Sequence, residues 1–138
     1  MPKKILPKRI GIVGSRRRNT GMDQVLLQVE IDRIYKIGDI FVSGGCPRGA
    51  DRMAEGIAIV RRIPIIIHEA KWEELGRVAG FVRNTLIARD SDVLIAMVAP
   101  DRTGGTEDTV SKMLALGKEV IYVPQRQPAD RQISLEER

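Results

Sequence analysis

Residues 39–51 read DIFVSGGCPRGAD, an apolar run that passes through a glycine-rich loop into the start of a helix. The apolar part contains Ile, Phe and Val without polar alternation, which is typical of a strand covered on both faces. Three glycines and a proline follow it, and they predict a loop with exposed amides. This stretch therefore predicts a strand–loop–helix unit.

The same unit recurs along the chain, because short apolar runs alternate with helical patterns. The predicted strands are RIGIVG (9–14), DIFVSGG (39–45), PIIIHE (64–69), DVLIAMV (92–98) and EVIYVP (119–124). The predicted helices are Met22–Ile37, Ala50–Arg62, Ala79–Ala88 and Glu107–Leu116. Gly38 and Gly117 stand where the first and last helices are expected to end.

This order predicts an α/β fold, namely a Rossmann-like, doubly wound parallel sheet of about five strands in the order 3-2-1-4-5 with helices on both faces. The strand order reverses between strands 1 and 4. In such sheets the ligand lies beyond the carboxyl ends of the strands at the reversal, here the loops after Gly14, Ser43 and Ala99. We expect one domain over residues 1–124 and a polar tail over 125–138, either disordered or laid across a neighbouring surface.

Composition indicates a soluble globular protein, with 43% hydrophobic and 30% charged residues. No apolar run approaches the roughly 20 residues of a membrane span, and the basic start lacks a signal peptide's cleavage region. Cys46 has no cysteine partner for a disulfide or a structural zinc site. We therefore expect a cytoplasmic protein without membrane, metal or cofactor binding.

The net charge of +5 favours anionic partners. A small phosphate ligand and a nucleic-acid backbone both satisfy that balance, and solvated arginines need no partner. Two Tyr, two Phe and one Trp are too few for the stacking platforms of single-strand binders. Nucleic acid is therefore the secondary hypothesis.

Four segments contain the candidate ligand-binding residues. Gly14, Ser15 and Arg16 follow the first strand, although a glycine there is also a simple turn, and at most one or two arginines of the run 16–18 are expected to reach a pocket. The second loop supplies backbone amides and a helix start suited to phosphate, without the Gly-Lys-Ser/Thr of a Walker A loop. Its candidates are Gly44, Gly45, Arg48, Gly49 and Asp51.

Asp51 either stabilises the helix dipole or binds a ribose hydroxyl, and Cys46 is interpreted as a small loop residue. The third segment offers Gly104, Gly105 and Thr106, the last as a helix cap, with Glu107 and Asp108 in the first turn.

The fourth segment runs from Trp72 to Asn84. There Arg83 could clamp phosphate or carboxylate and Asn84 could read a base or ribose. Trp72 is expected to be a pocket wall or a core residue, and His68 to be structural or peripheral.

Three of these patterns together resemble a known superfamily. They are strand-SGG-x-x-x-GAD-helix (43–51), W-x-x-x-G-x-x-AG-x-x-RN (72–84) and GGT (104–106). The combination, over about residues 9–124, is similar to the SLOG superfamily of Rossmann-like nucleotide-binding proteins, and within it to the small YspA/YpsA-related group. The resemblance implies a ligand site at Gly44, Gly45, Arg48, Gly49, Asp51, Arg83, Asn84, Gly104, Gly105 and Thr106.

The superfamily includes LOG-type phosphoribohydrolases with a PGG-x-GT-x-x-E motif, and DNA-processing DprA/Smf proteins. This chain has Thr109 at the position of the final glutamate. The leading hypothesis is a binding or sensing domain for a nucleotide-like small molecule. The alternatives are a hydrolase of an N-glycosidic or phosphoester bond, with Glu107, Asp51 or Arg83 as catalytic candidates, and single-stranded DNA binding. The oligomeric state, a homo-oligomer included, stays open.

Overall fold

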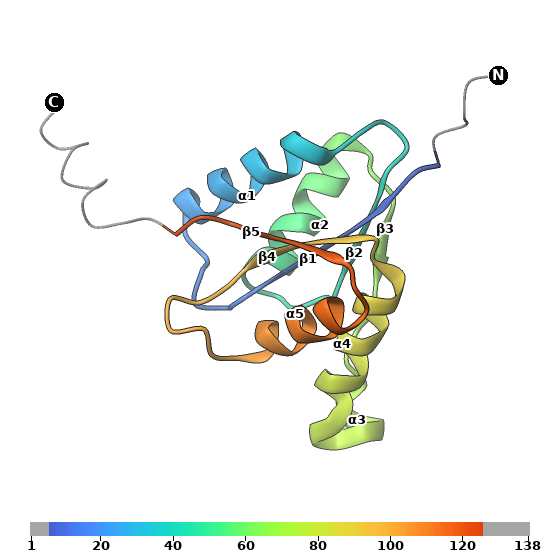
Figure 1. Ribbon diagram of the computed structural model, residues 1–138. Coiled ribbons are helices and arrows are strands. Elements are labelled where there is room, and N and C mark those ends of the chain that lie inside the picture. Colours follow the sequence, from blue (N-terminus) through green and yellow to red (C-terminus); the bar gives the residue numbers. More distant parts are fainter. Residues whose placement is uncertain (1–5, 126–138) are drawn as a thin grey trace, which may run out of the picture.

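The computed structural model describes residues 6–125, which form one five-stranded sheet with helices on both faces (Figure 1). All neighbouring strands pair in parallel, in the order β3-β2-β1-β4-β5. The strands are β1 (Arg9–Gly14), β2 (Ile40–Ser43), β3 (Ile65–Ile67), β4 (Val93–Met97) and β5 (Glu119–Tyr122). The predicted doubly wound sheet and its strand order are therefore confirmed.

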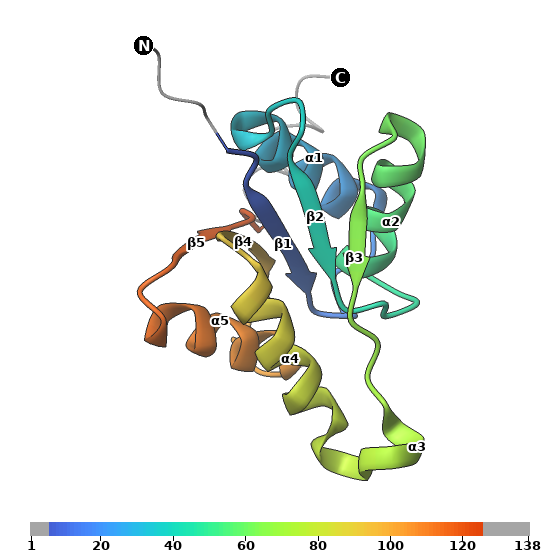
Figure 2. The same cartoon turned by 90° about the vertical axis from the view of Figure 1, so that its right-hand side faces the viewer.

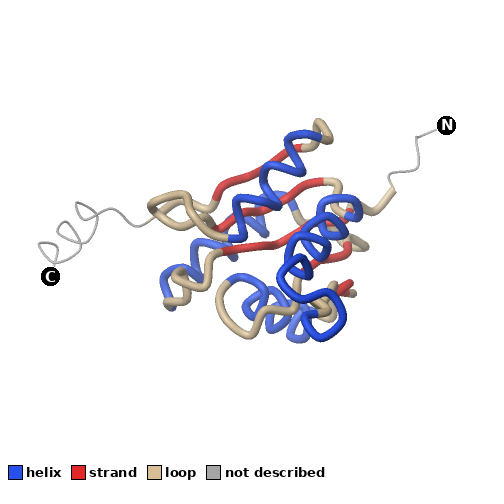
Figure 3. The backbone as a smooth tube through the Cα atoms, turned by 90° about the horizontal axis from the view of Figure 1, so that it is seen from below, coloured by secondary structure: helices blue, strands red, loops and turns tan. Residues whose placement is uncertain are grey.

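The helices lie in two layers. They are α1 (Gly21–Ile34), α2 (Ala50–Arg61), the short α3 (Trp72–Leu75), the 3-10 turn η1 (Gly76–Val78), α4 (Ala79–Asp90) and α5 (Gly105–Ala115). Helices α1 and α2 cover one face of the sheet, and α4 and α5 cover the other (Figure 2). Figure 3 shows the strands side by side, with helices in front of and behind them.

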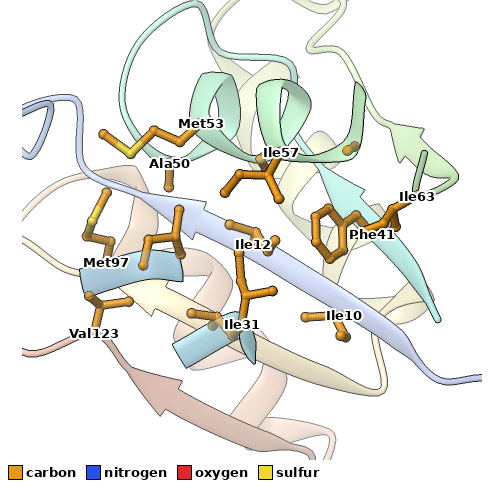
Figure 4. Close-up of a cluster of buried hydrophobic side chains, with 14 of the residues drawn as sticks. Ile10, Ile12, Ile31, Phe41, Ala50, Met53, Ile57, Ile63, Met97 and Val123 are labelled. Atoms are coloured by element: carbon orange, nitrogen blue, oxygen red, sulfur yellow. The ribbon is translucent and has the colours of Figure 1, made fainter. Parts of the chain in front are cut away.

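Each face of the sheet has its own hydrophobic core. Along β4, Val93 and Ile95 point to the α1/α2 face, whereas Leu94 and Ala96 point to the α4/α5 face. Figure 4 shows the first core, with side chains of α2 packed over those of β1. Residues on both sides of each strand are thus apolar, and this explains why the strands lack polar alternation.

The first helix is shorter than predicted. It ends at Ile34 instead of Ile37, because Tyr35 is extended, with φ −67° and ψ 132°. Asp39 accepts a hydrogen bond from the N–H of Lys36 at 2.9 Å and so stabilises a turn that leads into β2. Gly38 has a positive φ of 99° in that turn, and its predicted role as the helix stop was wrong.

The helix predictions differ from the structure at two further places. Helix α5 begins at Gly105 instead of Glu107, while Gly117, with φ 70°, follows its end as predicted. The α3 and η1 segment was not predicted as helical. The predicted tail over 125–138 lies, apart from Gln125, outside the described residues.

A buried arginine connects the start of α1 to the ends of β4 and β5. The Arg18 guanidinium donates hydrogen bonds to the carbonyls of Val98 (3.3 Å), Val123 (3.0 Å) and Pro124 (2.6 Å). Its Nε also pairs with Asp23 at 3.1 Å, and Asp23 completes the capping box of α1. Because this side chain is only 6% exposed, the contacts are formed away from water.

We predict that Arg18→Ala lowers the free energy of unfolding by about 3 kcal/mol, because it leaves Asp23 without its charge partner and three carbonyls without a donor. Urea denaturation measures this loss. The matched control is Arg17→Ala, whose half-exposed pair with Asp101 should cost less. Equal losses at the two neighbouring arginines would contradict the structural role of Arg18.

Candidate functional site

A cleft of about 530 Å³ lies at the carboxyl ends of β1 and β4, where the strand order reverses. The loops after β1, β2 and β4 line it, together with the start of α5 and one side of α4. Both its position and its volume are typical of small-ligand sites in doubly wound sheets. The two glycine-rich loops of the sequence thus meet at one cleft.

Most of the predicted site residues line this cleft. They are Gly14, Ser15, Arg16, Gly44, Gly45, Asp51, Arg83, Asn84, Gly104, Gly105 and Thr106. Three candidates do not line it. Arg48 is exposed outside the cleft, Gly49 is buried, and Glu107 forms two hydrogen bonds with Arg102, at 2.9 and 2.8 Å.

Gly49 has a structural role instead. Its φ is 74°, and a Cβ there would lie 2.9 Å from the carbonyl oxygen of Ser15. Its N–H donates to Asn19 Oδ1 at 2.9 Å. Glycine is therefore needed here so that the loop after β1 can contact the start of α2.

Gly44 gives two charged side chains access to the same point of the cleft. A Cβ on Gly44 would lie 2.9 Å from Arg83 Nη1 and 3.0 Å from Asp51 Oδ2. In its absence, Arg83 Nη1 donates to the Gly44 carbonyl at 3.0 Å. The loop after β2 and helix α4, far apart in sequence, are thus held together across the cleft.

The side-chain amide of Asn84 forms hydrogen bonds with other residues of the protein. Its Nδ2 donates to the Gly105 carbonyl at 3.3 Å and to Asp108 at 3.1 Å, and its Oδ1 accepts from Arg83 Nε at 2.9 Å. The amide therefore orients the Arg83 guanidinium and connects α4 to the start of α5. This arrangement gives Asn84 a positioning role beside the predicted reading of a base or ribose.

Asp51 is a buried carboxyl group in the wall of the cleft, 7% exposed. Burial raises its pKa to about 6, against the opposing effects of the Cys46 N–H, which donates to it at 3.0 Å, and of the positive Arg83. A hydroxyl group, which can donate to a carboxylate, suits this wall better than a phosphate does.

The start of α5 opens onto the cleft without a side-chain cap. Its N-cap is Gly104, so the predicted cap at Thr106 was wrong. The first-turn acids pair elsewhere, Glu107 with Arg102 and Asp108 with Lys112. Within residues 6–125, the N–H groups of Gly105 and Thr106 have no hydrogen-bond acceptor. Free amides and the helix dipole together favour an anion here.

The three consecutive arginines have three different surroundings, as expected for loop residues that point in different directions. Arg16 lines the cleft and forms no ion pair among the described residues. Arg17 also lines it, but its guanidinium holds Asp101 at 2.9 and 2.8 Å and the Thr103 hydroxyl at 3.0 Å. This contact keeps the pKa of Asp101 well below its usual range. Arg18 points away, so two of the three arginines reach the cleft.

Several lining residues were not predicted, among them Glu69, Thr103 and Thr109. Glu69 could have been found, because it follows β3 and the carboxyl ends of parallel strands meet at one edge. Trp72 forms part of the wall, one of the two places expected for it. His68 lies outside the cleft, with Nε2 2.6 Å from Asp90 Oδ2, which agrees with its expected peripheral role.

Residues 6–125 contain neither a metal-binding cluster nor a membrane-spanning helix. No three His, Cys, Asp or Glu side chains come together there in a way that could hold a metal ion. None of the helices in that range has the length and apolar character needed to cross a bilayer.

The raised pKa of Asp51 has a consequence for stability. A carboxyl group with a pKa of about 6 when folded and about 3.9 when unfolded binds its proton more tightly in the folded state. Stability therefore falls as pH rises from about 4 through about 6. We predict that Asp51→Asn does not show this loss. The free energy of unfolding of the variant minus that of the wild type should therefore rise by about 2 kcal/mol between pH 4 and pH 7. A difference between the two proteins that does not change with pH would contradict the shift.

This chain resembles several solved structures in its fold. The sequence matches none of the protein-family models and none of the curated proteins with which it was compared. DNA processing protein A from Helicobacter pylori, described with a single-stranded DNA binding mode, has a TM-score of 0.68 at 19% identity over 96% of this chain and 73% of that one.

Two further structures are similar. The molybdenum cofactor binding protein of the phototrophic bacterium Rippkaea orientalis has a TM-score of 0.63 at 20% identity, over 97% of this chain and 86% of that one. DNA processing protein A of Streptococcus pneumoniae has a TM-score of 0.65 at 17% identity, over 95% of this chain and 56% of that one. The chain thus shares the fold of DNA-processing and cofactor-binding proteins.

Proposed function

We propose that the cleft binds a nucleotide or a similar phosphorylated small molecule, and that the protein is a binding or sensing domain. The observation that carries this proposal is the start of α5, where the N–H groups of Gly105 and Thr106 open onto the cleft and have no acceptor among the residues that the structure describes. Arg16 lines the same cleft with its charge unpaired among residues 6–125. Amides, helix dipole and guanidinium together suit a phosphate group.

The part of the lining around Gly44 suits the sugar of such a ligand. There the buried Asp51 and the Arg83 guanidinium lie beside Gly44. A carboxyl group accepts a hydrogen bond from a ribose hydroxyl, and it would repel a phosphate. The cleft thus has an end that favours phosphate and a wall that favours hydroxyl groups, and its volume is of the size that a mononucleotide requires.

The comparisons support this proposal at the level of fold. Structures with the same architecture include a protein described as binding single-stranded DNA and one described as binding a molybdenum cofactor. The SGG-x-x-x-GAD, W-x-x-x-G-x-x-AG-x-x-RN and GGT patterns lead us to place this chain with the YspA/YpsA-related group of the SLOG superfamily.

Hydrolysis of the ligand has less support than binding. Thr109, at the position of the motif glutamate of LOG-type enzymes, lines the cleft and is 1% exposed. The Glu107 carboxylate is held by Arg102 outside the cleft. Asp51 remains as a carboxyl group that could transfer a proton. We therefore propose binding without fast release of a base.

Calorimetric titration with adenosine and guanosine monophosphates tests the proposal. We expect Arg83→Ala to weaken binding by about 10- to 100-fold, because a charge-assisted hydrogen bond to the ligand is lost. Arg61→Ala is the control, since Arg61 pairs with Asp32 at 2.6 Å and does not line the cleft. Equal effects at the two arginines would show that net charge alone attracts the nucleotide.

Single-stranded DNA binding is the second candidate, favoured by the net charge of +5 and by the likeness to DNA processing protein A. The two candidates differ in salt dependence, because each neutralised phosphate of a strand releases counterions. Between about 50 and 200 mM salt we expect a mononucleotide to keep most of its affinity and an oligonucleotide to bind weakly and be lost. An oligonucleotide that stays bound more tightly than the mononucleotide at high salt would favour DNA.

A further inference from the structure

The chain that leaves β3 contributes two large side chains to the cleft, Glu69 and Trp72. In Figure 2 the strands β1, β2 and β3 end at the same edge of the sheet, and the chain continues from β3 to α3 beyond that edge. The start of α5, where we place the phosphate, follows β4 instead. The carboxyl ends of β4 and β3 are three strand spacings apart, or about 14 Å. The cleft therefore has room for a second part of the ligand at its β3 end.

Glu69 lies over the loop that follows β2. A Cβ on Gly45 would lie 3.0 Å from Glu69 Cγ and 3.7 Å from its Oε1, so the missing side chain at position 45 makes room for the glutamate. Glu69 is exposed at this rim of the cleft and forms no ion pair among residues 6–125. Its carboxylate is therefore available to accept hydrogen bonds from a ligand.

Trp72 provides a flat apolar surface at the same end of the cleft. A Cβ on Gly80 would lie 3.2 Å from Trp72 Cη2, so the indole packs against α4 where no side chain separates them. Trp72 nevertheless stays 57% exposed and lines the cleft. One edge of the indole is thus held by α4 while much of the ring is open. Such a ring is a surface on which a nucleic-acid base can stack.

The chemistry of the lining changes along the edge of the sheet in the order of the parts of a nucleotide. The amides at the start of α5 follow β4, Asp51 follows β2, and Glu69 follows β3. A mononucleotide has its phosphate, ribose and base joined in this same order. Two carboxyl groups at the β2 and β3 end also disfavour a phosphate there. The charges of the cleft therefore favour one direction of binding, with the base between Glu69 and Trp72.

We propose that Glu69 and Trp72 form a base site that prefers guanine to adenine. This inference rests on the proposed function, because it takes the phosphate to lie at the start of α5. Guanine presents two adjacent N–H donors, at N1 and at the N2 amino group, and one carboxylate accepts both. Adenine places the acceptor N1 at the corresponding position, where it would face the carboxylate without a proton between them. Glu69 thus determines specificity, while Trp72 stacks on either base.

Calorimetric titration of the wild-type chain with three nucleotides tests this preference without any variant. We expect guanosine monophosphate to bind about 10-fold more tightly than adenosine monophosphate. Inosine monophosphate should lie between them, because it keeps N1–H but lacks the N2 amino group. Equal affinities, or a preference for adenosine monophosphate, would overturn the guanine site while leaving the proposed function intact. Failure of all three nucleotides to bind would contradict the proposed function itself, and the base site with it.

The variant Glu69→Gln tests the residue that is proposed to select the base. Its amide can donate to adenine N1 and accept from the adenine amino group, so the preference should reverse, with guanosine monophosphate about 10-fold weaker than in the wild type. Glu74→Gln is the matched control, because it removes the same charge from an exposed residue that does not line the cleft. An unchanged preference in Glu69→Gln, or an equal change in Glu74→Gln, rejects the role of Glu69.

Tryptophan fluorescence reports on the base directly, because Trp72 is the sole tryptophan of the chain. A base stacked on the indole should quench its emission with guanosine monophosphate, whereas ribose 5-phosphate, which has no base, should not. Trp72→Leu should weaken both nucleotides by a similar factor of about 10 and leave their ratio unchanged. Emission that does not respond to bound guanosine monophosphate, or that responds equally to ribose 5-phosphate, rejects a base site at Trp72.

Discussion

The pairing of β1 with β4 is the contact on which the site depends. Five residue pairs, from Ile10 with Val93 to Gly14 with Met97, join the two halves of the sheet in parallel. After β1 the chain passes to the face covered by α1, whereas after β4 it passes to the face covered by α5. The two connections diverge from adjacent strand ends, and the cleft lies in the space that they leave.

Close packing around this point explains why small residues surround the cleft. A Cβ on Gly14 would lie 2.7 Å from the Cβ of Ala50 and 2.9 Å from that of Met97. The start of α2 can therefore approach β1 only because position 14 has no side chain. Gly14 is thus required for the packing of α2 on β1. The absence of a side chain there would also let a ligand approach the backbone, so one glycine serves both purposes.

The polar groups of the cleft fall into those committed to the fold and those that remain available. Arg17 is occupied by Asp101 and Thr103, and the Asn84 amide is occupied on all sides. Arg16 and the first amides of α5 have no such partner among the described residues, and these are the groups that the proposed ligand would contact. This division gives the cleft a rigid frame and a small number of open contacts, which limits the ordering cost of binding.

The sequence was sufficient for the strand order because apolar runs are local signals, whereas the glycine at position 38 placed the end of α1 too late. The predicted strand order alone placed both glycine-rich loops at the carboxyl-end edge of the sheet. The sequence could not show that Gly49 serves packing or that Glu107 pairs with Arg102, because those contacts depend on how the loops fold. The buried role of Arg18 rests on carbonyl groups about 80 and 105 positions away in the chain. The α3 segment was missed because four residues give too short a pattern.

The central place of β1 also governs how the chain can fold as it is synthesised. Its neighbour β2 and the next strand β3, which pairs with β2, follow it in the chain with α1 and α2, so one side of the sheet and much of one core can form early. The other edge of β1 must wait for β4, about 80 residues later. Until then one edge of β1 stays unpaired. We therefore expect the partly synthesised chain to be the form most prone to aggregate and to bind chaperones.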